Sequence, residues 1–334
     1  MIVGSLPKPA WLADPNELRA AWRQEGEAWR QGTEDAVRLA VLAQREAGMD
    51  LVTDGEQRRQ HYISYFIHGL QGFDFNRMVD KQTRGGKYTA SVPTVVDKIR
   101  WPGPVQLADL RALMAYAKGP VKFTLPGPMT IADTSFAEGV YRDPETYVMD
   151  LAAAVNQEVR ALAELGPDII QIDEPVFNAE LEKTKAYGIA ALDRAIEGVA
   201  CTTAVHVCYG YGTESVLRWK SANTKWDQYD FLLPLLAQSH ISQLSLEFAA
   251  SKLEPKVLAL AGDKEIAFGC VDVSPAPAEA AEVVAARIRG ALAYVPAARL
   301  YPSTDCGLVP LGRDLAGAKM RSLAQAAEIV RREL

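Results

Sequence analysis

Two patterns of hydrophobic and polar positions alternate along this chain. Short runs rich in Val, Ile, Leu and Phe are separated by longer stretches whose apolar residues recur at helical spacing. Such short runs are typical of buried strands, and the longer stretches predict amphipathic helices. We expect helices over 34–48, 145–165, 279–293 and 314–332, and eight strands near 1–5, 50–54, 121–125, 168–173, 203–208, 243–248, 266–273 and 299–305.

Strands that alternate with helices indicate a parallel sheet built from repeated strand–helix units. Eight such strands within 334 residues predict a (β/α)8 TIM barrel, in which residues 1–334 form a single catalytic domain. Residues 72–104 do not fit the alternation. Their Arg84-Gly85-Gly86-Lys87 run favours a turn between two strands, so we expect an inserted hairpin after the second strand, in a position to cover a site. Residues 210–225, rich in small polar residues, are predicted to form a loop.

Composition limits the classes of partner. With 49% hydrophobic and 23% charged residues, the chain has the material for a large core. Its net charge of -6 and isoelectric point near 5.4 argue against nucleic acid or an anionic membrane as the main partner. The expected partners are small molecules.

Cysteine content and hydropathy bear on location. Four scattered cysteines, without a signal-peptide pattern ahead of them, indicate a reducing compartment rather than a disulfide framework. No apolar run approaches the roughly 20 residues needed to span a bilayer. We therefore expect a cytoplasmic protein.

Four residues with metal-binding side chains lie at or just after predicted strand ends. His206 and Cys208 are two positions apart, so on a strand they point to one face. Glu247 and Cys306 hold comparable positions on two later strands. One imidazole, two thiolates and a carboxylate suit tetrahedral Zn²⁺. The alternative is that each is an ordinary core residue, as we expect for Cys201 and Cys270.

Other strand ends also carry polar groups. Gln171 and Asp173 alternate with two isoleucines and should face the barrel axis, while Glu56 follows the second strand. Gly4 and Ser5 follow the first, where glycine allows a ligand to approach the backbone. Acidic groups would bind a substrate ammonium, and the backbone its carboxylate. Helix capping or a structural ion pair is the alternative for Glu56 and Asp173.

Seven motifs in fixed order resemble the catalytic barrel of the cobalamin-independent methionine synthase family. They are VGSLPKP, TDGEQRR, LPGPMTI, IQIDEP, HVCYG, LEF and STDCGL. The resemblance covers nearly the whole chain and implies a zinc-dependent methyltransferase that converts homocysteine to methionine. It implies that the zinc ligands are His206, Cys208, Glu247 and Cys306. It also implies that Val3, Gly4, Ser5, Glu56 and Asp173 bind homocysteine, with Glu56 and Asp173 as the catalytic carboxylates.

The implied chemistry begins at the metal, because zinc coordination removes the proton of a thiol that otherwise titrates near ~8.5. Homocysteine sulfur would enter the coordination sphere while Glu247 moves aside, and would then attack the methyl group.

Several departures from the family pattern concern the methyl donor. Asp133-Thr134-Ser135 stand where the family has Asn-Trp-Ser, and Ala90-Ser91 where it has Arg-Cys. Asp272-Val273-Ser274-Pro275 lack a family histidine that protonates the leaving group. The chain also lacks the second barrel of longer members. The donor is therefore either 5-methyltetrahydrofolate or a methylcorrinoid, with a corrinoid or accessory protein as a further partner. Arg58-Arg59 would contact an anionic folate tail or form a solvated basic patch.

Two other functions fit some of these features. A relative that alkylates another thiol, as in an epoxide and coenzyme M pair, would keep the zinc site. The Gly4, Ser5, Glu56 and Asp173 set instead favours an amino-acid thiol. A metal-free decarboxylase of the uroporphyrinogen type would not need both Cys208 and Cys306.

Overall fold

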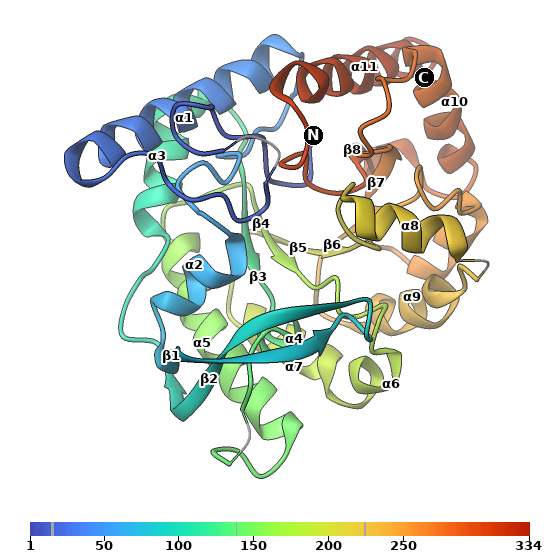
Figure 1. Ribbon diagram of the computed structural model, residues 1–334. Coiled ribbons are helices and arrows are strands. Elements are labelled where there is room, and N and C mark those ends of the chain that lie inside the picture. The colour runs from blue at the N-terminus through green and yellow to red at the C-terminus, as the bar shows by residue number, and fades with distance from the viewer. Residues whose placement is uncertain (15–16, 138, 224) are drawn as a thin grey trace.

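A parallel sheet forms the centre of the molecule, surrounded by helices (Figure 1). The computed structural model describes residues 1–14, 17–137, 139–223 and 225–334. Six strands follow one another across the sheet in chain order, and each pairs in parallel with the next. These strands are β3 (Lys122–Pro126), β4 (Ile169–Asp173), β5 (Thr202–Val207), β6 (Gln243–Glu247), β7 (Glu265–Val271) and β8 (Leu300–Thr304).

Helices connect the strands and cover the sheet (Figure 1). They are α1 (Gly26–Glu46), α2 (Tyr62–His68), α3 (Leu107–Ala117), α4 (Pro128–Asp133), α5 (Pro144–Ala163), α6 (Leu181–Lys183), α7 (Ile189–Ile196), α8 (Glu214–Ala222), α9 (Gln228–Gln238), α10 (Ala281–Leu292) and α11 (Arg313–Arg331). Shorter helical turns cover Thr184–Gly188, Pro255–Ala261 and Ala297–Arg299. The four predicted helices agree with α1, α5, α10 and α11, although α1 begins earlier than expected.

The burial pattern explains the local structure. All residues of β3, β4 and β6 are buried, as expected for strands covered on both faces, and this is why their sequences read as short apolar runs. Helix α5 starts where its sequence provides a cap. The Asp143 side chain accepts a hydrogen bond from the Thr146 amide at 2.7 Å, and Pro144 occupies the first turn.

The first two predicted strands appear as single bridges rather than extended ladders. Val52 forms a parallel bridge with Val121 just before β3, and Ser5 forms one with Gly55. The first segment also reaches the last strand, because the Val3 amide donates to Thr304 Oγ1 at 3.1 Å and the Leu308 amide to the Ser5 carbonyl at 2.9 Å. These contacts place residues 1–6 between the second segment and β8.

The inserted hairpin lies where the sequence predicted it. Strands β1 (Gln71–Thr83) and β2 (Tyr88–Arg100) pair antiparallel, and the turn between them has positive φ at Arg84, Gly85 and Gly86. Lys81 fixes the hairpin to the rest of the fold by donating to the carbonyls of Ala132 and Ser135. In Figure 1 the hairpin is drawn in front of α4 and α7, below the strands of the sheet.

Residues 210–225 differ from the expectation of a loop. Helix α8 occupies most of this stretch, because Val216 and Lys220 are buried on one side of it while Glu214 and Arg218 are exposed. Within the described ranges, no helix is both long and apolar enough to cross a membrane.

Candidate metal centre and substrate cavity

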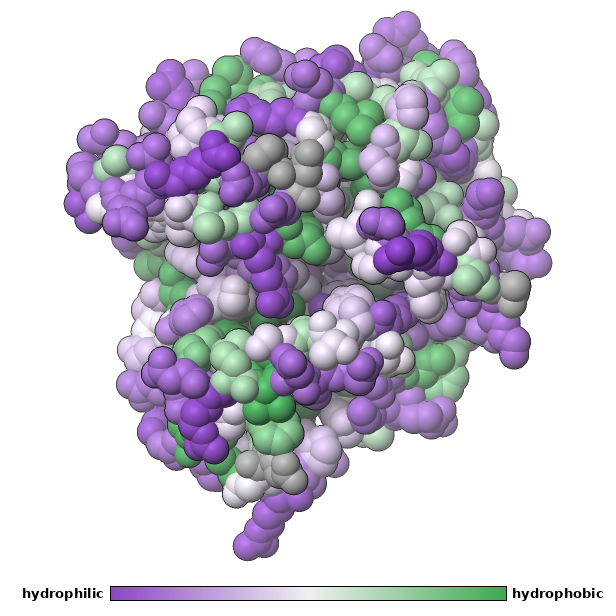
Figure 2. Space-filling view, in the orientation of Figure 1, coloured by the Kyte–Doolittle hydropathy of each residue, from purple (hydrophilic) through white to green (hydrophobic). Residues whose placement is uncertain are grey.

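A cavity of about 640 Å³ opens at the carboxyl ends of the strands. The molecular surface is hollowed on the face shown in Figure 2. The residues that line the cavity come from strand ends, from the hairpin turn and from the segment before α8. Lys87 of the turn lies 3.6 Å from the ring centre of Trp219 on α8, so these two elements meet at the cavity edge. The lining includes Val3, Ser5, Glu56, Tyr62, Arg84, Lys87, Asp173, His206, Cys208, Tyr211 and Cys306.

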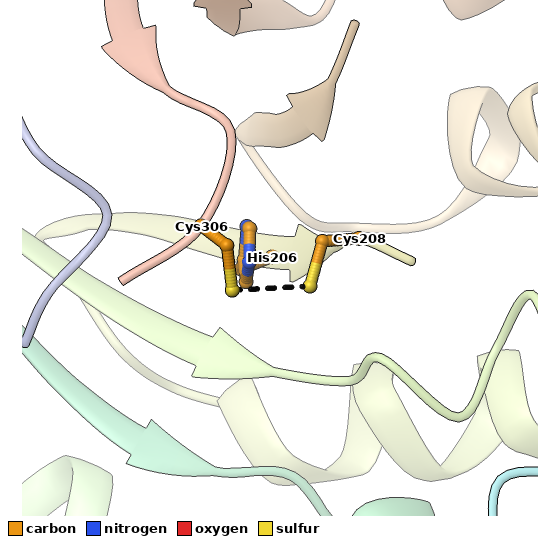
Figure 3. A group of neighbouring side chains, drawn as sticks. All are labelled: His206, Cys208 and Cys306. Atoms are coloured by element: carbon orange, nitrogen blue, oxygen red, sulfur yellow. Dashed lines mark hydrogen bonds between the residues drawn. The ribbon is translucent and has the colours of Figure 1, made fainter. Parts of the chain in front are cut away.

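Three of the four predicted metal ligands form one buried group. The candidate ligand atoms of His206, Cys208 and Cys306 all lie within 4.8 Å of one another. The two sulfurs are 3.5 Å apart, and Figure 3 shows the two side chains side by side, with their sulfurs joined by a dashed line. A hydrogen bond from the Cys306 thiol lowers the pKa of Cys208, so one of the two sulfurs readily becomes a thiolate.

The surroundings of His206 suit a metal ligand. Its Nδ1 lies 3.1 Å from both the carbonyl and the hydroxyl oxygen of Ser245. When Nδ1 carries the proton and donates to that carbonyl, Nε2 presents a lone pair. Nε2 is buried and has no hydrogen-bond partner among the described residues. An imidazole with a free nitrogen beside two thiols is a donor set that fits Zn²⁺.

Glu247, the fourth predicted ligand, lies outside this compact group. Its carboxylate forms a 2.7 Å ion pair with Lys220 of α8 and accepts a hydrogen bond from the Tyr209 amide at 2.9 Å. Burial and the nearby Cys208 raise the pKa of this carboxyl group, and Lys220 opposes that rise. Lys220 was not among the residues predicted for the site, because helix α8 was not expected.

The predicted amino-acid site lies beside the metal group. Ser5, Glu56 and Asp173 line the same cavity, and the Ser5 hydroxyl has no partner among the described residues. Gly4 lies behind this surface, where an added Cβ would approach Thr124 at 3.0 Å. Glu56 has a positive φ of 57°, which turns the chain sharply after the second segment.

Both acidic side chains are buried. Burial raises the pKa of Asp173 to about 7 and also raises the pKa of Glu56. The nearby Glu56 carboxylate contributes to the raised pKa of Asp173, so a cation beside the two acidic groups would be favourable. Gln171 donates to Asp173 at 2.8 Å and stabilises its ionised form.

Arg58 and Arg59 were expected either to contact an anionic folate tail or to form a solvated basic patch, and the structure shows both in ion pairs instead. Arg59 is fully buried and binds both carboxylate oxygens of Asp54, at 2.7 and 2.8 Å. Arg58 pairs with Asp109 at 2.7 Å. Both are structural ion pairs that hold the segment after Glu56, and neither lines the cavity.

The positions that depart from the family pattern are divided between two places. Thr134, Ala90 and Ser91 line the cavity, where the aromatic side chains come instead from Tyr62, Tyr88, Tyr209 and Tyr211. Residues 272–275 lie outside the lining, and Asp272 accepts hydrogen bonds from the amide and hydroxyl of Ser274.

Sequence reasoning also missed Arg84 and Asp305. The carboxylate of Asp305 accepts hydrogen bonds from the Phe248, Ala249 and Ala250 amides, which fixes the chain just after Glu247. Arg84 is buried at the cavity wall, with Nη2 donating to the Tyr62 hydroxyl at 3.3 Å. The STDCGL motif contains Asp305, but the motif alone does not reveal its partners.

The fold and the site define a class of protein: an α/β protein with a thiol-rich group that could hold a metal, in a cavity at the carboxyl ends of its strands. The family described as cobalamin-independent synthase, catalytic domain, matches residues 1–329. The chain therefore belongs to the cobalamin-independent methionine synthase family.

Individual relatives agree with this family. A methionine synthase of Saccharolobus solfataricus is 33% identical, over 100% of this chain and 95% of its own length. A methionine synthase of Sulfolobus acidocaldarius is 31% identical, over 100% of this chain and 92% of its own. The solved structure of a B12-independent methionine synthase from Shewanella sp. W3-18-1, in complex with selenomethionine, is 42% identical. It has a TM-score of 0.96 and covers 99% of this chain and 97% of its own.

Proposed function

We propose that this protein transfers a methyl group to the sulfur of L-homocysteine and so forms methionine. The observation that carries the proposal is the position of His206, Cys208 and Cys306 in the same cavity as two buried carboxylates. Family membership and the relatives named methionine synthase support this activity over alkylation of another thiol or decarboxylation.

His206, Cys208, Glu247 and Cys306 are the proposed zinc ligands. Bound zinc would lower the pKa of the substrate thiol and keep its sulfur as a thiolate at neutral pH. The chain contributes the position of each ligand. His206 lies near the end of β5 and Cys208 directly follows this strand, and Ser245 orients the imidazole so that Nε2 is free.

Glu56 and Asp173 are proposed to bind the homocysteine ammonium, while the backbone of Val3, Gly4 and Ser5 binds its carboxylate. Two buried carboxylates gain from a cation between them, which supports this orientation. The substrate sulfur then points to the cysteine pair, because all these groups share one cavity. Holding the sulfur in one orientation favours in-line attack on the methyl group.

The methyl donor is proposed to occupy the part of the cavity that the hairpin lines. Thr134, Ala90 and Ser91 line the cavity without the aromatic or basic groups that the family uses for folate. A tertiary amine donor needs a proton on its leaving nitrogen, and residues 272–275 do not line the cavity. These features favour a methylcorrinoid, delivered by a partner protein, over free 5-methyltetrahydrofolate.

The architecture around the site is proposed to be a closed (β/α)8 barrel that comprises the whole chain, 1–334, as one catalytic domain. The bridge from Ser5 to Gly55 and the hydrogen bonds from residues 1–6 to the end of β8 and the segment after it support closure. The four unpaired cysteines are consistent with the cytoplasmic location predicted from the sequence.

The test is to measure zinc content and methionine formation in the same preparation, with methylcobalamin and 5-methyltetrahydrofolate offered in parallel. Cys306→Ser should lose zinc and lower activity by more than about 100-fold, beyond the usual effect of outer contacts of a metal site. Circular dichroism should show an unchanged fold.

Cys201→Ser is the matched control, because Cys201 is half-buried and lies outside the metal group. It should retain zinc and activity. A Cys306→Ser protein with full activity would rule out the zinc–thiolate mechanism. Turnover of methylcobalamin alone would support a corrinoid donor, whereas turnover of the folate would contradict it.

A further inference from the structure

Lys220 is a buried cation beside the proposed metal centre. Its ammonium lies 2.7 Å from Glu247 Oε1, and the two side chains are only 6% and 0% exposed. It also donates to the Gly210 carbonyl at 3.3 Å. Lys220 and Glu247 therefore form a buried ion pair next to the two cysteines.

Glu247 is held in place at its backbone. Its backbone amide donates to the Tyr229 hydroxyl at 3.0 Å, and that hydroxyl donates to the Val207 carbonyl at 2.8 Å. The Tyr209 amide binds the other carboxylate oxygen. Changes in Glu247 contacts must therefore come mainly from rotation of its side chain.

Two cations compete for this one carboxylate if Glu247 is a zinc ligand. One is the metal held by His206, Cys208 and Cys306, and the other is Lys220. A carboxylate released from a metal in a dry cavity would be left as an uncompensated buried charge, which is strongly destabilising. Lys220 supplies the compensating charge within hydrogen-bonding distance.

We propose that Lys220 is a positioning residue that receives the Glu247 carboxylate when the homocysteine sulfur takes its place at the metal. This inference rests on the proposed function, because it needs Glu247 as the exchangeable ligand. Lys220 stabilises the arrangement in which Glu247 is withdrawn, so it weakens zinc binding by the free protein and strengthens homocysteine binding by the zinc-loaded protein.

The experiment compares Lys220→Met with the unaltered protein by two binding measurements. Metal-depleted protein is titrated with zinc in competition with a chromophoric chelator, and homocysteine is titrated into zinc-loaded protein by calorimetry. Loss of the buried partner should tighten zinc binding about 100-fold. It should weaken homocysteine binding about tenfold or more, because the displaced carboxylate has no partner.

Three further variants define the result. Lys220→Arg keeps the charge and should restore both affinities to within about threefold. Arg218→Met is the matched control on α8, where Arg218 forms an exposed ion pair with Glu214, and it should change neither affinity. Lys220→Gln keeps a hydrogen-bond donor and should shift both affinities in the same directions by less, which provides a second variant if Lys220→Met fails to fold.

Two results would overturn the inference. One leaves the proposed zinc ligands intact, and the other removes Glu247 from them. A folded Lys220→Met protein with unchanged zinc and homocysteine affinities, alongside weaker zinc binding in Glu247→Gln, removes the role of Lys220 but leaves the ligand set intact. Unchanged zinc affinity in Glu247→Gln shows that Glu247 is not a ligand, which overturns both the inference and that part of the proposed function.

Discussion

Asp173 shows how burial prepares a single residue for a charged ligand. The pKa of Asp173 rises to about 7, mainly because the carboxylate is buried and also because the Glu56 carboxylate lies nearby. A carboxylate with a raised pKa gains most from a cation that restores its charge. A substrate ammonium between Asp173 and Glu56 would therefore be bound more tightly as the pair ionises.

We predict that Asp173→Asn raises KM for homocysteine roughly tenfold to a hundredfold, because a hydrogen bond to a charged group is lost. The kcat should change less, since Asp173 does not touch the methyl group. Steady-state kinetics with varied homocysteine measures both.

Asp168→Asn is the matched control, at the opposite end of β4. Asp168 accepts a hydrogen bond from the Val121 amide, and an asparagine oxygen accepts the same bond. This variant should leave KM unchanged. An unaltered KM and kcat in Asp173→Asn would exclude Asp173 from the substrate site.

At the level of elements, one buried network joins β3, β4 and the first segment. Lys122 of β3 donates to Gln171 Oε1 at 2.8 Å. Gln171 must then present its amide nitrogen, which donates to Asp173 and to the Val3 carbonyl at 3.2 Å. Lys122 thus fixes the orientation of the Gln171 amide. That amide in turn holds Asp173 and the Val3 backbone, the two parts of the proposed amino-acid site that it contacts.

We predict that the stability difference between the unaltered protein and Lys122→Met depends on pH. Burial lowers the pKa of Lys122 from 10.5 to about 7. Between these values the unfolded chain binds more protons than the folded one, so the folded state gains stability as the pH rises. Chemical unfolding at pH 6 and pH 9 measures the free energy of unfolding of both proteins. From pH 6 to pH 9 the difference between them should shift in favour of the unaltered protein by at most about 3 kcal/mol.

Lys319→Met serves as a comparison at another buried lysine. Burial lowers the pKa of Lys319 as well, but it donates to the Asp272 carbonyl, away from the cavity. Lys122→Met should also raise KM for homocysteine, whereas Lys319→Met should not. A stability difference that stays constant from pH 6 to pH 9 would contradict a lowered pKa for Lys122.

At the level of the whole molecule, residues 1–6 connect the second segment, around Gly55, to the last strand β8. Residues 1–6 form only one bridge to the second segment, but the Leu6 amide also donates to the Gly55 carbonyl at 3.0 Å. The Val3 and Leu308 amides connect the same segment to β8. These contacts are buried, so they exclude water without forming long ladders.

We predict that hydrogen exchange in the first and second segments is as slow as in β3 to β8, because closure of the barrel would allow these amides to open only with the core. Exchange measured by mass spectrometry on peptides that cover 1–8 and 50–56 tests this. Peptides from the α8 surface, where Arg218 and Glu214 are exposed, should exchange faster and calibrate the scale. Rapid exchange in 1–8 would show an open sheet.

Much of the fold followed from local patterns. The apolar runs identified all six strands of the sheet, and the Arg84 to Lys87 turn identified the hairpin. The family prediction was confirmed over residues 1–329. The two-residue spacing of His206 and Cys208 predicted that their side chains point the same way, since side chains alternate along a strand, and their candidate ligand atoms lie within 4.8 Å of each other.

Local patterns in the sequence were sufficient for the order of the elements, for the family, and for which chemical groups stand at the ends of strands. Which of these groups meet follows only from the tertiary packing. Lys220 and Glu247, 27 positions apart, pair across α8 and β6, and Arg58 pairs with Asp109, 51 positions away. The physical reason is that periodicity reports the environment of one segment, whereas charge pairing and burial depend on segments that are distant in the chain.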